Sequence, residues 1–384
     1  MTKKLNAPAI RFKGFSDAWE QRKVQDVADR FDNLRIPVAA NLRVHGTTPY
    51  YGANGIQDYV EGFTHDGEFV LVAEDGANDL KNYPVKCVNG RIWVNNHAHI
   101  LQGKAGIADN SFLAFAISQS DIESLLVGGG RAKLNAETLM SIEFRLPCLQ
   151  EQYRIGEYLT QLDHLITLHQ RKFEKLTNVK KSMLEKMFPK NGSSYPEIRF
   201  KGFTDPWEQR KLGEVATFIN GRAYSQPELL SSGKYKVLRV GNFYTNDSWY
   251  YSDLELGEKY YADYGDLLYT WSATFGPHIW LGDRVIYHYH IWKINLSDQL
   301  EKQFAVQLLE QDRANILSSK NGSTMVHITK EGMEQKDVII PPSTKEQQEI
   351  GAFFLQLDHL ITLHQRKLEK LQNIKKSMLE KMFV

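Results

Sequence analysis

The chain has little cysteine, no long apolar run and almost no net charge, and each shortage excludes a class of protein. Cys87 and Cys148 are the only two cysteines among 384 residues, and no metal-ligand spacing surrounds them. We therefore expect neither a disulfide scaffold nor a cysteine-bound metal. No apolar stretch approaches the roughly 18 residues that span a bilayer, and residues 1–8 lack the apolar segment of a secretion signal. These observations predict a cytoplasmic protein.

The formal net charge is only +1, from 47 Lys and Arg against 46 Asp and Glu. A protein that binds DNA by neutralising many phosphates is usually strongly basic. If this chain binds DNA, it does so through local patches or together with partner proteins.

Recognisable catalytic motifs are also lacking. Residues 232–235 read Ser-Gly-Lys-Tyr, without the first Gly and the hydroxyl residue of a phosphate-binding loop. Pro341-Pro342 follows Ile340, so the Asn-Pro-Pro-aromatic signature of amino-methyltransferases is missing. Several histidines lie in strand-like contexts without a convincing third metal ligand; they are His97, His99, His278, His288 and His290. We expect no metal site and no catalytic centre in this chain.

What the sequence does contain is an internal repeat with unlike middles. Residues 8–28 match residues 196–216 at 15 of 21 positions, and residues 161–188 match 356–383 at 25 of 28. The stretches between these segments show almost no resemblance. A turn-rich joint at 189–196 separates the copies. Because only the flanks are alike, we interpret them as a shared frame that carries two different recognition domains.

The second segment of each copy predicts a long helix. Apolar or long side chains recur at alternating steps of four and three, which is the heptad pattern of a coiled-coil seam. Each helix follows a proline and has a Glu-Gln pair in its first turn. The central seam residues are Leu162, Ile166, His169, Phe173 and Leu176 in the first helix, and Leu357, Ile361, His364, Leu368 and Leu371 in the second.

Two strong helices with matching seams in one chain are expected to pair antiparallel. A helix of 38 residues is about 57 Å long. That length is enough to hold two domains about one turn of DNA apart, which is roughly 34 Å. Under a symmetric register, His169 and His364 would meet near the middle. Two interpretations of these histidines stay open. They are buried polar residues that fix the register of the two helices, or they are exposed or hydrogen-bonded within their own helix.

Taken together, these features resemble the specificity (S) subunit of type I restriction–modification systems. The shared pattern is a Pro-x-x-x-Glu-Gln element before each helix, at Pro147 with Glu151-Gln152 and at Pro342 with Glu346-Gln347. Arg-Phe-x-Gly-Phe followed by Trp-Glu, at 11–20 and 199–208, also resembles the start of that family's recognition domains. Short sequence motifs that also resemble this family lie at 49–56, 72–76, 238–242 and 265–270. The resemblance covers residues 8 to 384.

The resemblance implies an α+β architecture and a non-catalytic, DNA-binding role. It implies two pseudo-twofold-related target-recognition domains, mixed α/β with curved sheets, separated by two long antiparallel helices that form a coiled coil. Each domain would read one half of a bipartite, gapped site in double-stranded DNA. The helices would set the gap and dock two modification subunits, which use S-adenosylmethionine to methylate adenine at N6. Two restriction subunits with ATP and Mg²⁺ would cleave unmodified DNA.

The predicted domains follow from the repeat: 1–150 is the first recognition domain, 151–188 the first helix, 189–345 the linker with the second recognition domain, and 346–384 the second helix. Aromatic residues that recur in both copies, Phe12, Trp19, Phe200 and Trp207, are expected to clamp each domain to the helices.

DNA-contacting residues are expected among polar and aromatic side chains on turn-rich loops, since Arg, Lys, Asn and Gln read base edges. For each of them an exposed loop residue or a partly buried aromatic is an equal reading. The candidates are Tyr50, Tyr51, Asn54, Asn95, Asn96, His97, Arg131, Lys133 and Asn135 in the first domain, and Trp271, Ser272, Thr274, Lys320, Asn321, Ser323 and Thr324 in the second.

Two other functions stay open at the level of sequence. Duplication and long helices alone also suit a scaffold that holds two partner proteins on a coiled coil. The many Trp and Tyr residues also suit a pair of sugar- or ligand-binding domains. Loop-rich, divergent middles count against the scaffold, and the ruler-like helices count against the ligand-binding pair.

Overall fold

The computed structural model describes residues 8–128, 132–190, 192–244, 246–272, 274–318 and 328–383. The chain forms two compact units. Unit 1 comprises Met1–Arg171 with Gln365–Val384, and unit 2 comprises Lys172–His364. The boundaries fall inside the two long helices, so each unit contains one globular domain together with parts of both helices.

The globular part of unit 1 is built on one six-stranded sheet and a separate two-stranded sheet. The six strands lie in the order β2-β7-β5-β6-β3-β4, and β1 pairs with β8. All neighbours in the large sheet are antiparallel except β3 and β6, which run parallel. The elements are β1 (Glu20–Lys23), α1 (Val24–Val27), β2 (Ala28–Arg30), β3 (His45–Gly52), β4 (Gly55–Val60), β5 (His65–Ala73), β6 (Val85–Val94), β7 (Ala98–Gly103), α2 (Asn110–Ser118), α3 (Ala136–Ser141), β8 (Glu143–Leu146) and α4 (Leu149–Lys186).

Unit 2 repeats this strand topology with one break and one added strand, β13, beside β16. Its sheets run in the orders β10-β17-β14-β15 and β12-β11-β16-β13, with β9 paired to β18. The short strands β15 and β16 take the places of the single long strand β6, and β11 pairs parallel with β16 as β3 does with β6. The elements are β9 (Glu208–Lys211), α5 (Leu212–Val215), β10 (Ala216–Asn220), β11 (Tyr235–Leu238), β12 (Tyr250–Ser252), β13 (Tyr261–Ala262), β14 (Leu267–Ser272), β15 (Thr274–Ile279), β16 (Val285–Tyr287), β17 (Ile291–Leu296), α6 (Lys302–Ser318), α7 (Lys330–Glu334), β18 (Asp337–Ile340) and α8 (Thr344–Met382).

The Glu-Gln pair at the start of α4 holds the domain of unit 1 onto its helix. Glu151 is fully buried, and its carboxylate accepts two hydrogen bonds from the Arg11 guanidinium, at 2.8 and 2.6 Å, and one from Trp19 Nε1 at 3.2 Å. The hydrogen bond to Glu151 raises the pKa of Arg11. Gln152 accepts from the backbone N–H of Asp109, just before α2, at 2.9 Å. We call Arg11, Trp19 and Glu151 the lock of unit 1.

Unit 2 has the same lock, formed by Arg199, Trp207 and Glu346. The guanidinium donates to the buried carboxylate at 2.7 and 2.8 Å, and Trp207 Nε1 donates at 3.2 Å. Gln347 accepts from the backbone N–H of Glu301, just before α6, at 2.8 Å. The near-identical flanks therefore supply each buried carboxylate with the same guanidinium and indole donors, and such a charge pair is costly to leave incomplete.

The predicted aromatic clamps are confirmed, and a glycine explains the close approach of the helices. Phe12 contacts Tyr158 of α4, with ring centroids 5.9 Å apart, and Phe200 contacts Phe353 of α8 at 6.1 Å. A Cβ on Gly156 would lie 2.6 Å from Asp109 Oδ1 at the start of α2. Only glycine allows this approach of α4 to α2.

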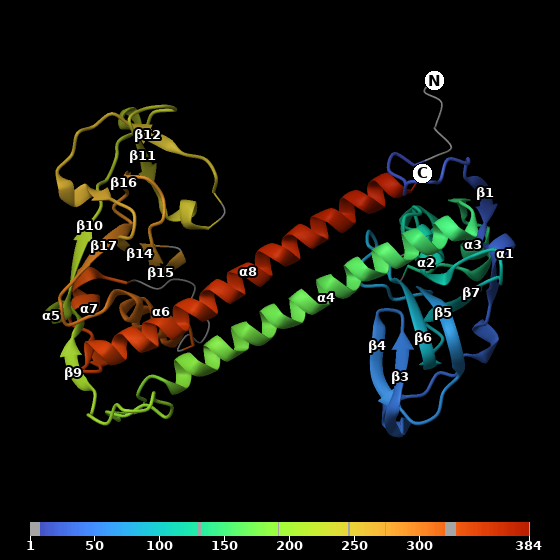
Figure 1. Cartoon of the computed structure of the whole chain (residues 1–384), viewed down its shortest axis with the longest axis horizontal. Helices are drawn as coiled ribbons and strands as arrows, with labels where there is room; N and C mark the ends of the chain where they lie inside the picture. The colour runs from blue at the N-terminus through green and yellow to red at the C-terminus, as the bar shows by residue number, and fades with distance from the viewer. Residues whose placement is uncertain are drawn as a thin grey trace. The chain divides into compact units, whose positions relative to one another are not determined.

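The two long helices, α4 in green and α8 in red in Figure 1, run antiparallel within each unit. In unit 1, Asp163 of α4 pairs with Lys375 of α8 at 2.5 Å, and in unit 2 Lys180 pairs with Asp358 at 2.5 Å. Leu162 lies in the core of unit 1 and the partly buried Leu371 packs against it, and in unit 2 Leu176 packs in the same way against a core that contains Leu357. The predicted mixed α+β architecture with two long antiparallel helices is thereby confirmed.

Other seam residues are half-buried or buried along the helices: Ile166, His169, Phe173, Ile361, His364 and Leu368. The meeting of His169 with His364, and the helix pair as a ruler, concern both units together and stay predictions. Among the described residues, no helix is long and apolar enough to cross a membrane.

Candidate nucleic-acid interface

Four chain segments of unit 1 meet at residues 74–78, directly after β5. The backbone N–H of Glu74 donates to His97 O at 2.9 Å, and Glu74 O accepts from Leu134 N at 2.7 Å. Asn54, in the turn between β3 and β4, donates to Gly76 O at 2.9 Å. We call residues 74–78, with the segments 32–35, 54, 95–99 and 132–135 that they contact, the Glu74 junction.

The centre of the Glu74 junction is ionic. The Glu74 carboxylate contacts Arg35 Nη1 at 2.5 Å and Lys133 Nζ at 2.8 Å, and it lies 3.7 Å from His99 Nδ1. Burial alone would raise the pKa of Glu74, but the hydrogen bonds from Lys133 and Arg35 hold it below its ordinary value. The pKa of Asp32 is lowered in the same way, against burial, by its hydrogen bond with His99 at 2.7 Å.

Several predicted residues of unit 1 come together here. His97 Nδ1 lies 2.5 Å from Asp75 Oδ1, and the His97 backbone N–H donates to Asn95 Oδ1 at 2.8 Å. Asn96, between them, is exposed. Lys133, in segment 132–135, reaches the junction with its ammonium group, and about half of its side chain is exposed. Asn54, Asn96, His97 and Lys133 thus share one surface, although they come from three separate loops, and the buried Asn95 holds the His97 backbone beneath it.

Three other predicted residues of unit 1 are placed differently. Tyr50 and Tyr51 are buried in the sheet, and Tyr50 Oη accepts from the backbone N–H of Val38 at 2.9 Å. These contacts favour a packing role for both rings. Asn135 is half-buried at the start of α3, where its carbonyl accepts from Leu139 N.

Unit 2 has an aromatic cluster at the corresponding position. Trp271 stacks on Trp292 with ring centroids 5.7 Å apart, and Trp292 stacks on the buried Tyr269 at 5.9 Å. The Trp271 indole N–H donates to Tyr289 O at 2.9 Å, and its ring meets that of His290 edge-on at 5.0 Å. We call Trp271, Tyr289, His290 and Trp292 the Trp271 cluster.

Two histidines of this region, His288 and His290, have lowered pKa values. Burial, together with the neighbouring His290 and Arg239, lowers the pKa of His288 to about 4. Burial also lowers the pKa of His290. These lowered pKa values favour uncharged imidazole rings near pH 7, and the neighbouring Tyr289 is 38% exposed.

The remaining predicted residues of unit 2 lie nearby or outside the described part of the chain. Ser272 pairs with Thr274 at the tip of the β14–β15 hairpin, where Thr274 is exposed. Arg131 in unit 1, and Lys320, Asn321, Ser323 and Thr324 in unit 2, lie outside the described residues.

Sequence reasoning missed the residues that organise both surfaces. Asp32, Arg35, Glu74 and His99 build the centre of the Glu74 junction, and Tyr289 and Trp292 build the Trp271 cluster. A signal was present at Glu74-Asp75-Gly76, where two acids and a glycine follow a continuous apolar run. Their partners are distant in sequence, so pattern reading alone does not connect them.

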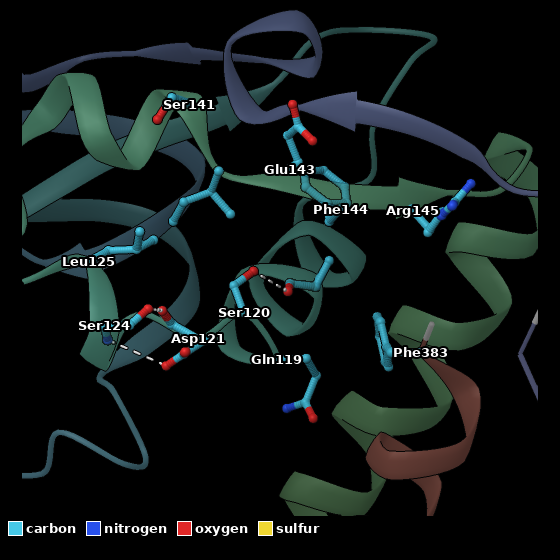
Figure 2. A pocket seen from close by; sticks show the side chains of 12 residues that line it. Gln119, Ser120, Asp121, Ser124, Leu125, Ser141, Glu143, Phe144, Arg145 and Phe383 are labelled. Atoms are coloured by element: carbon cyan, nitrogen blue, oxygen red, sulfur yellow. Dashed lines mark hydrogen bonds between the residues drawn. The ribbon is translucent and has the colours of Figure 1, made fainter. Parts of the chain in front are cut away.

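A metal site or a cavity in the part of the chain that the structure describes would offer a further place for a ligand. Among the described residues, no group of three His, Cys, Asp or Glu side chains could hold a metal ion. Unit 1 does have a cavity of about 350 Å³ where α2 ends, lined by Gln119, Ser124, Glu143 and Phe383 among others (Figure 2). In unit 2 the longer helix α6 continues at this place, and its Asp312 pairs with Lys336.

Comparison with known proteins gives these surfaces a context. The family model described as the type I restriction modification DNA specificity domain matches residues 16–178 and 204–373. A putative type I restriction enzyme specificity subunit of Haemophilus influenzae is 30% identical over 86% of this chain and 85% of its own length. The MjaVIII specificity subunit of Methanocaldococcus jannaschii is 24% identical over 94% of this chain and 91% of its own.

A solved structure shows the same fold. The S subunit of a type I restriction–modification system from M. genitalium superposes with a TM-score of 0.72 at 15% identity, covering 98% of this chain and 99% of that one. Two matches to the family model, each over one globular domain and much of its helix, agree with the duplicated lock and the duplicated strand order. The chain belongs to the type I restriction modification DNA specificity domain family, with two copies of that domain.

Proposed function

We propose that this chain is the DNA-recognition subunit of a type I restriction–modification complex, in which each unit reads one half of a bipartite, gapped site. The observation that carries the proposal is the pairing of a shared frame with different loop chemistry. Both units have the same lock, and the order β2-β7-β5-β6 matches β10-β17-β14-β15, yet unit 1 gathers Asn54, Asn96, His97 and Lys133 while unit 2 presents aromatic rings.

The chemistry of both surfaces suits double-stranded DNA. Amide, imidazole and ammonium groups such as those of Asn96, His97 and Lys133 can donate to base edges or phosphates. Aromatic rings such as that of Tyr289 offer apolar contact to bases or sugars. With a net charge of only +1, the chain lacks the charge for strong indiscriminate binding, so specificity rests on these local groups.

The long helices have a separate role in the proposal. The 38 residues of α4 and 39 residues of α8 set the gap between the two half-sites and dock two modification subunits. Those subunits bind S-adenosylmethionine and methylate adenine N6, while restriction subunits with ATP and Mg²⁺ cleave unmodified DNA. The chain itself is a non-catalytic subunit. The descriptions of its relatives as specificity subunits support this assignment.

The test is a genome-wide map of adenine methylation in cells that carry this gene with its modification partner. We expect one gapped motif to be methylated, and to disappear when the gene is deleted. If the partner binds the chain but no motif depends on it, the proposal is wrong, and a scaffold that holds two partner proteins becomes the better account.

A further inference from the structure

Glu74 and Trp271 occupy the same place in the two units, although their surroundings share no sequence similarity. In unit 1 the last pair between β5 and β7 is Ala73 with Ala98, and in unit 2 the last pair between β14 and β17 is Thr270 with Ile291. The residue that follows, Glu74 or Trp271, donates its backbone N–H to the residue just before the next strand. The acceptors are His97 O at 2.9 Å and His290 O at 3.2 Å.

The side chains of this position also reach equivalent neighbours. The Glu74 carboxylate approaches His99, the second residue of β7, at 3.7 Å. The Trp271 ring stacks on Trp292, the second residue of β17, at 5.7 Å. One position of the fold thus contacts the same place on the neighbouring strand in both units, by charge in one and by stacking in the other.

Each side chain then holds a loop that carries exposed groups. Glu74 binds Lys133, and its backbone carbonyl holds the next residue, Leu134. Trp271 uses its indole N–H to hold the carbonyl of Tyr289, whose ring is exposed. The polar atoms of Glu74 and Trp271 are therefore already engaged by the protein.

We propose that Glu74 and Trp271 are positioning residues that determine how the first and the second half of the DNA site are read. They act through the segments they hold, residues 95–97 and 132–135 in unit 1 and residues 288–290 in unit 2. This inference rests on the proposed function, since it names the residues that position its two reading surfaces. It predicts that a minimal change at either position alters one half of the motif and spares the other.

Two substitutions test it in the complete complex with the modification partner. Glu74→Gln keeps the shape but removes the charge, so a single amide oxygen replaces a carboxylate that holds two cations. Trp271→Phe keeps a ring on Trp292 but removes the N–H that holds Tyr289 O. The matched controls are Glu20→Gln, whose partner Arg22 lies on β1 outside the six-stranded sheet, and Trp280→Phe, whose indole N–H donates to Asp283 O at 2.8 Å.

The readout is the methylated motif, scored separately for each half. We expect Glu74→Gln to lower the preference at one or more positions of one half by roughly tenfold, the size of a typical lost base discrimination. Trp271→Phe should do the same in the other half only. Both controls should leave both halves unchanged. The wild-type map serves as the check on the proposed function: without a gapped motif there, the proposed function fails before the variants are considered.

Two results would overturn the inference while leaving the proposed function intact. One is a wild-type motif in both variants. The other is an equal loss in both halves from a variant that melts within about two degrees of its control. If Glu74→Gln does not fold, Trp271→Phe alone decides, because its change leaves the stacked ring in place.

Discussion

At one position of a shared topology, unit 1 has a carboxylate and unit 2 has an indole. Around Glu74, loops are held by ion pairs with Arg35 and Lys133, whereas around Trp271 they are held by stacking and one indole hydrogen bond. The strand order and the backbone hydrogen bond at this position are the same in both units. The comparison teaches that the fold provides a place for the reading loops, and that the side chain at that place decides how they are held.

The two locks differ from this position, because each consists of the same three residue types in both units. Arg11, Trp19 and Glu151 repeat as Arg199, Trp207 and Glu346, with distances that agree within a few tenths of an ångström. The parts that join domain to helix are constant, and the parts that face outward vary. Four predictions test this division, from the largest expected effect to the smallest.

Removing the lock's carboxylate should have the largest effect, and the same effect in either unit. Glu151→Ala and Glu346→Ala each leave a guanidinium and an indole N–H without their buried acceptor, which costs about 3–5 kcal/mol of unfolding free energy. Denaturant melts of the complex measure it. Glu20→Ala, which breaks an exposed pair with Arg22, is the control and should cost under about 1 kcal/mol. If Glu151→Ala and Glu346→Ala lowered the unfolding free energy by different amounts, the two locks would not be equivalent.

Acid should weaken unit 2 through its buried histidines. Burial and the nearby Arg313 lower the pKa of His278 to about 4, and the pKa of His288 is also lowered to about 4. A lowered histidine pKa means that the unfolded chain binds protons more readily, so stability is full above pH 6.5 and is lost as pH falls toward 4. We expect each of these two histidines to contribute a loss of up to roughly 3 kcal/mol over this window, with less from the half-buried His288, which water still reaches.

The measurement is the melting temperature from pH 7.5 to 4.5 for the natural chain and for His278→Gln. Removing this titrating group should flatten part of the decline. Because burial also lowers the pKa of His65 in unit 1, the variant comparison is needed to assign the effect to unit 2. An unchanged slope in His278→Gln would contradict the assignment.

The ionic centre of unit 1 should also restrain its binding to unrelated DNA. In Glu74→Gln, Lys133 loses its carboxylate partner and can contact a phosphate, whereas Arg35 keeps Asp32 nearby. The logarithm of the binding constant should then fall more steeply with the logarithm of salt concentration, by about 0.9 for one added phosphate contact. Trp271→Phe frees no charge and should leave that slope unchanged. Titrations of the complex with unrelated DNA at several salt concentrations measure these slopes. Identical slopes for both variants would contradict the proposed difference between the two units.

The smallest effect is expected at the ion pairs between the helices. Asp163–Lys375 and Lys180–Asp358 are equivalent in the repeat, and their carboxylates are 43% and 37% exposed. Solvent screening limits such pairs to about 0.2–1 kcal/mol each. Double-mutant cycles with Asn and Met measure the coupling, and a value above about 2 kcal/mol at either pair would show that they fix the helix register.

The repeated parts could be predicted from the sequence because repetition itself marks them. The seam of Leu162, Leu176 and Leu357, and the clamping role of Phe12 and Phe200, follow from periodicity and from recurrence at the same places. Even so, the sequence marks the Glu-Gln pair only as a helix-start signal, whereas Glu151 and Gln152 are buried acceptors that bind the domain.

The reading surfaces could be predicted only in part. Asn54, His97 and Lys133 stand out as polar residues on loops, and the structure brings them together. The Glu74–Arg35 pair joins residues 39 positions apart, and the Glu74–Lys133 pair spans still more. Such contacts depend on strand order, which periodicity does not reveal. Tyr50 shows the converse, because an aromatic in a turn-rich stretch is buried in the sheet.

One measurement tests the central claim, that a constant frame carries two independent readers. Residues 217–340 are replaced by the corresponding region of a relative whose methylated motif is known, and adenine methylation is mapped with the original modification partner. We predict that one half of the motif changes to that of the relative, while the other half and the length of the gap stay the same. A change in both halves, or an unchanged motif, would contradict the account.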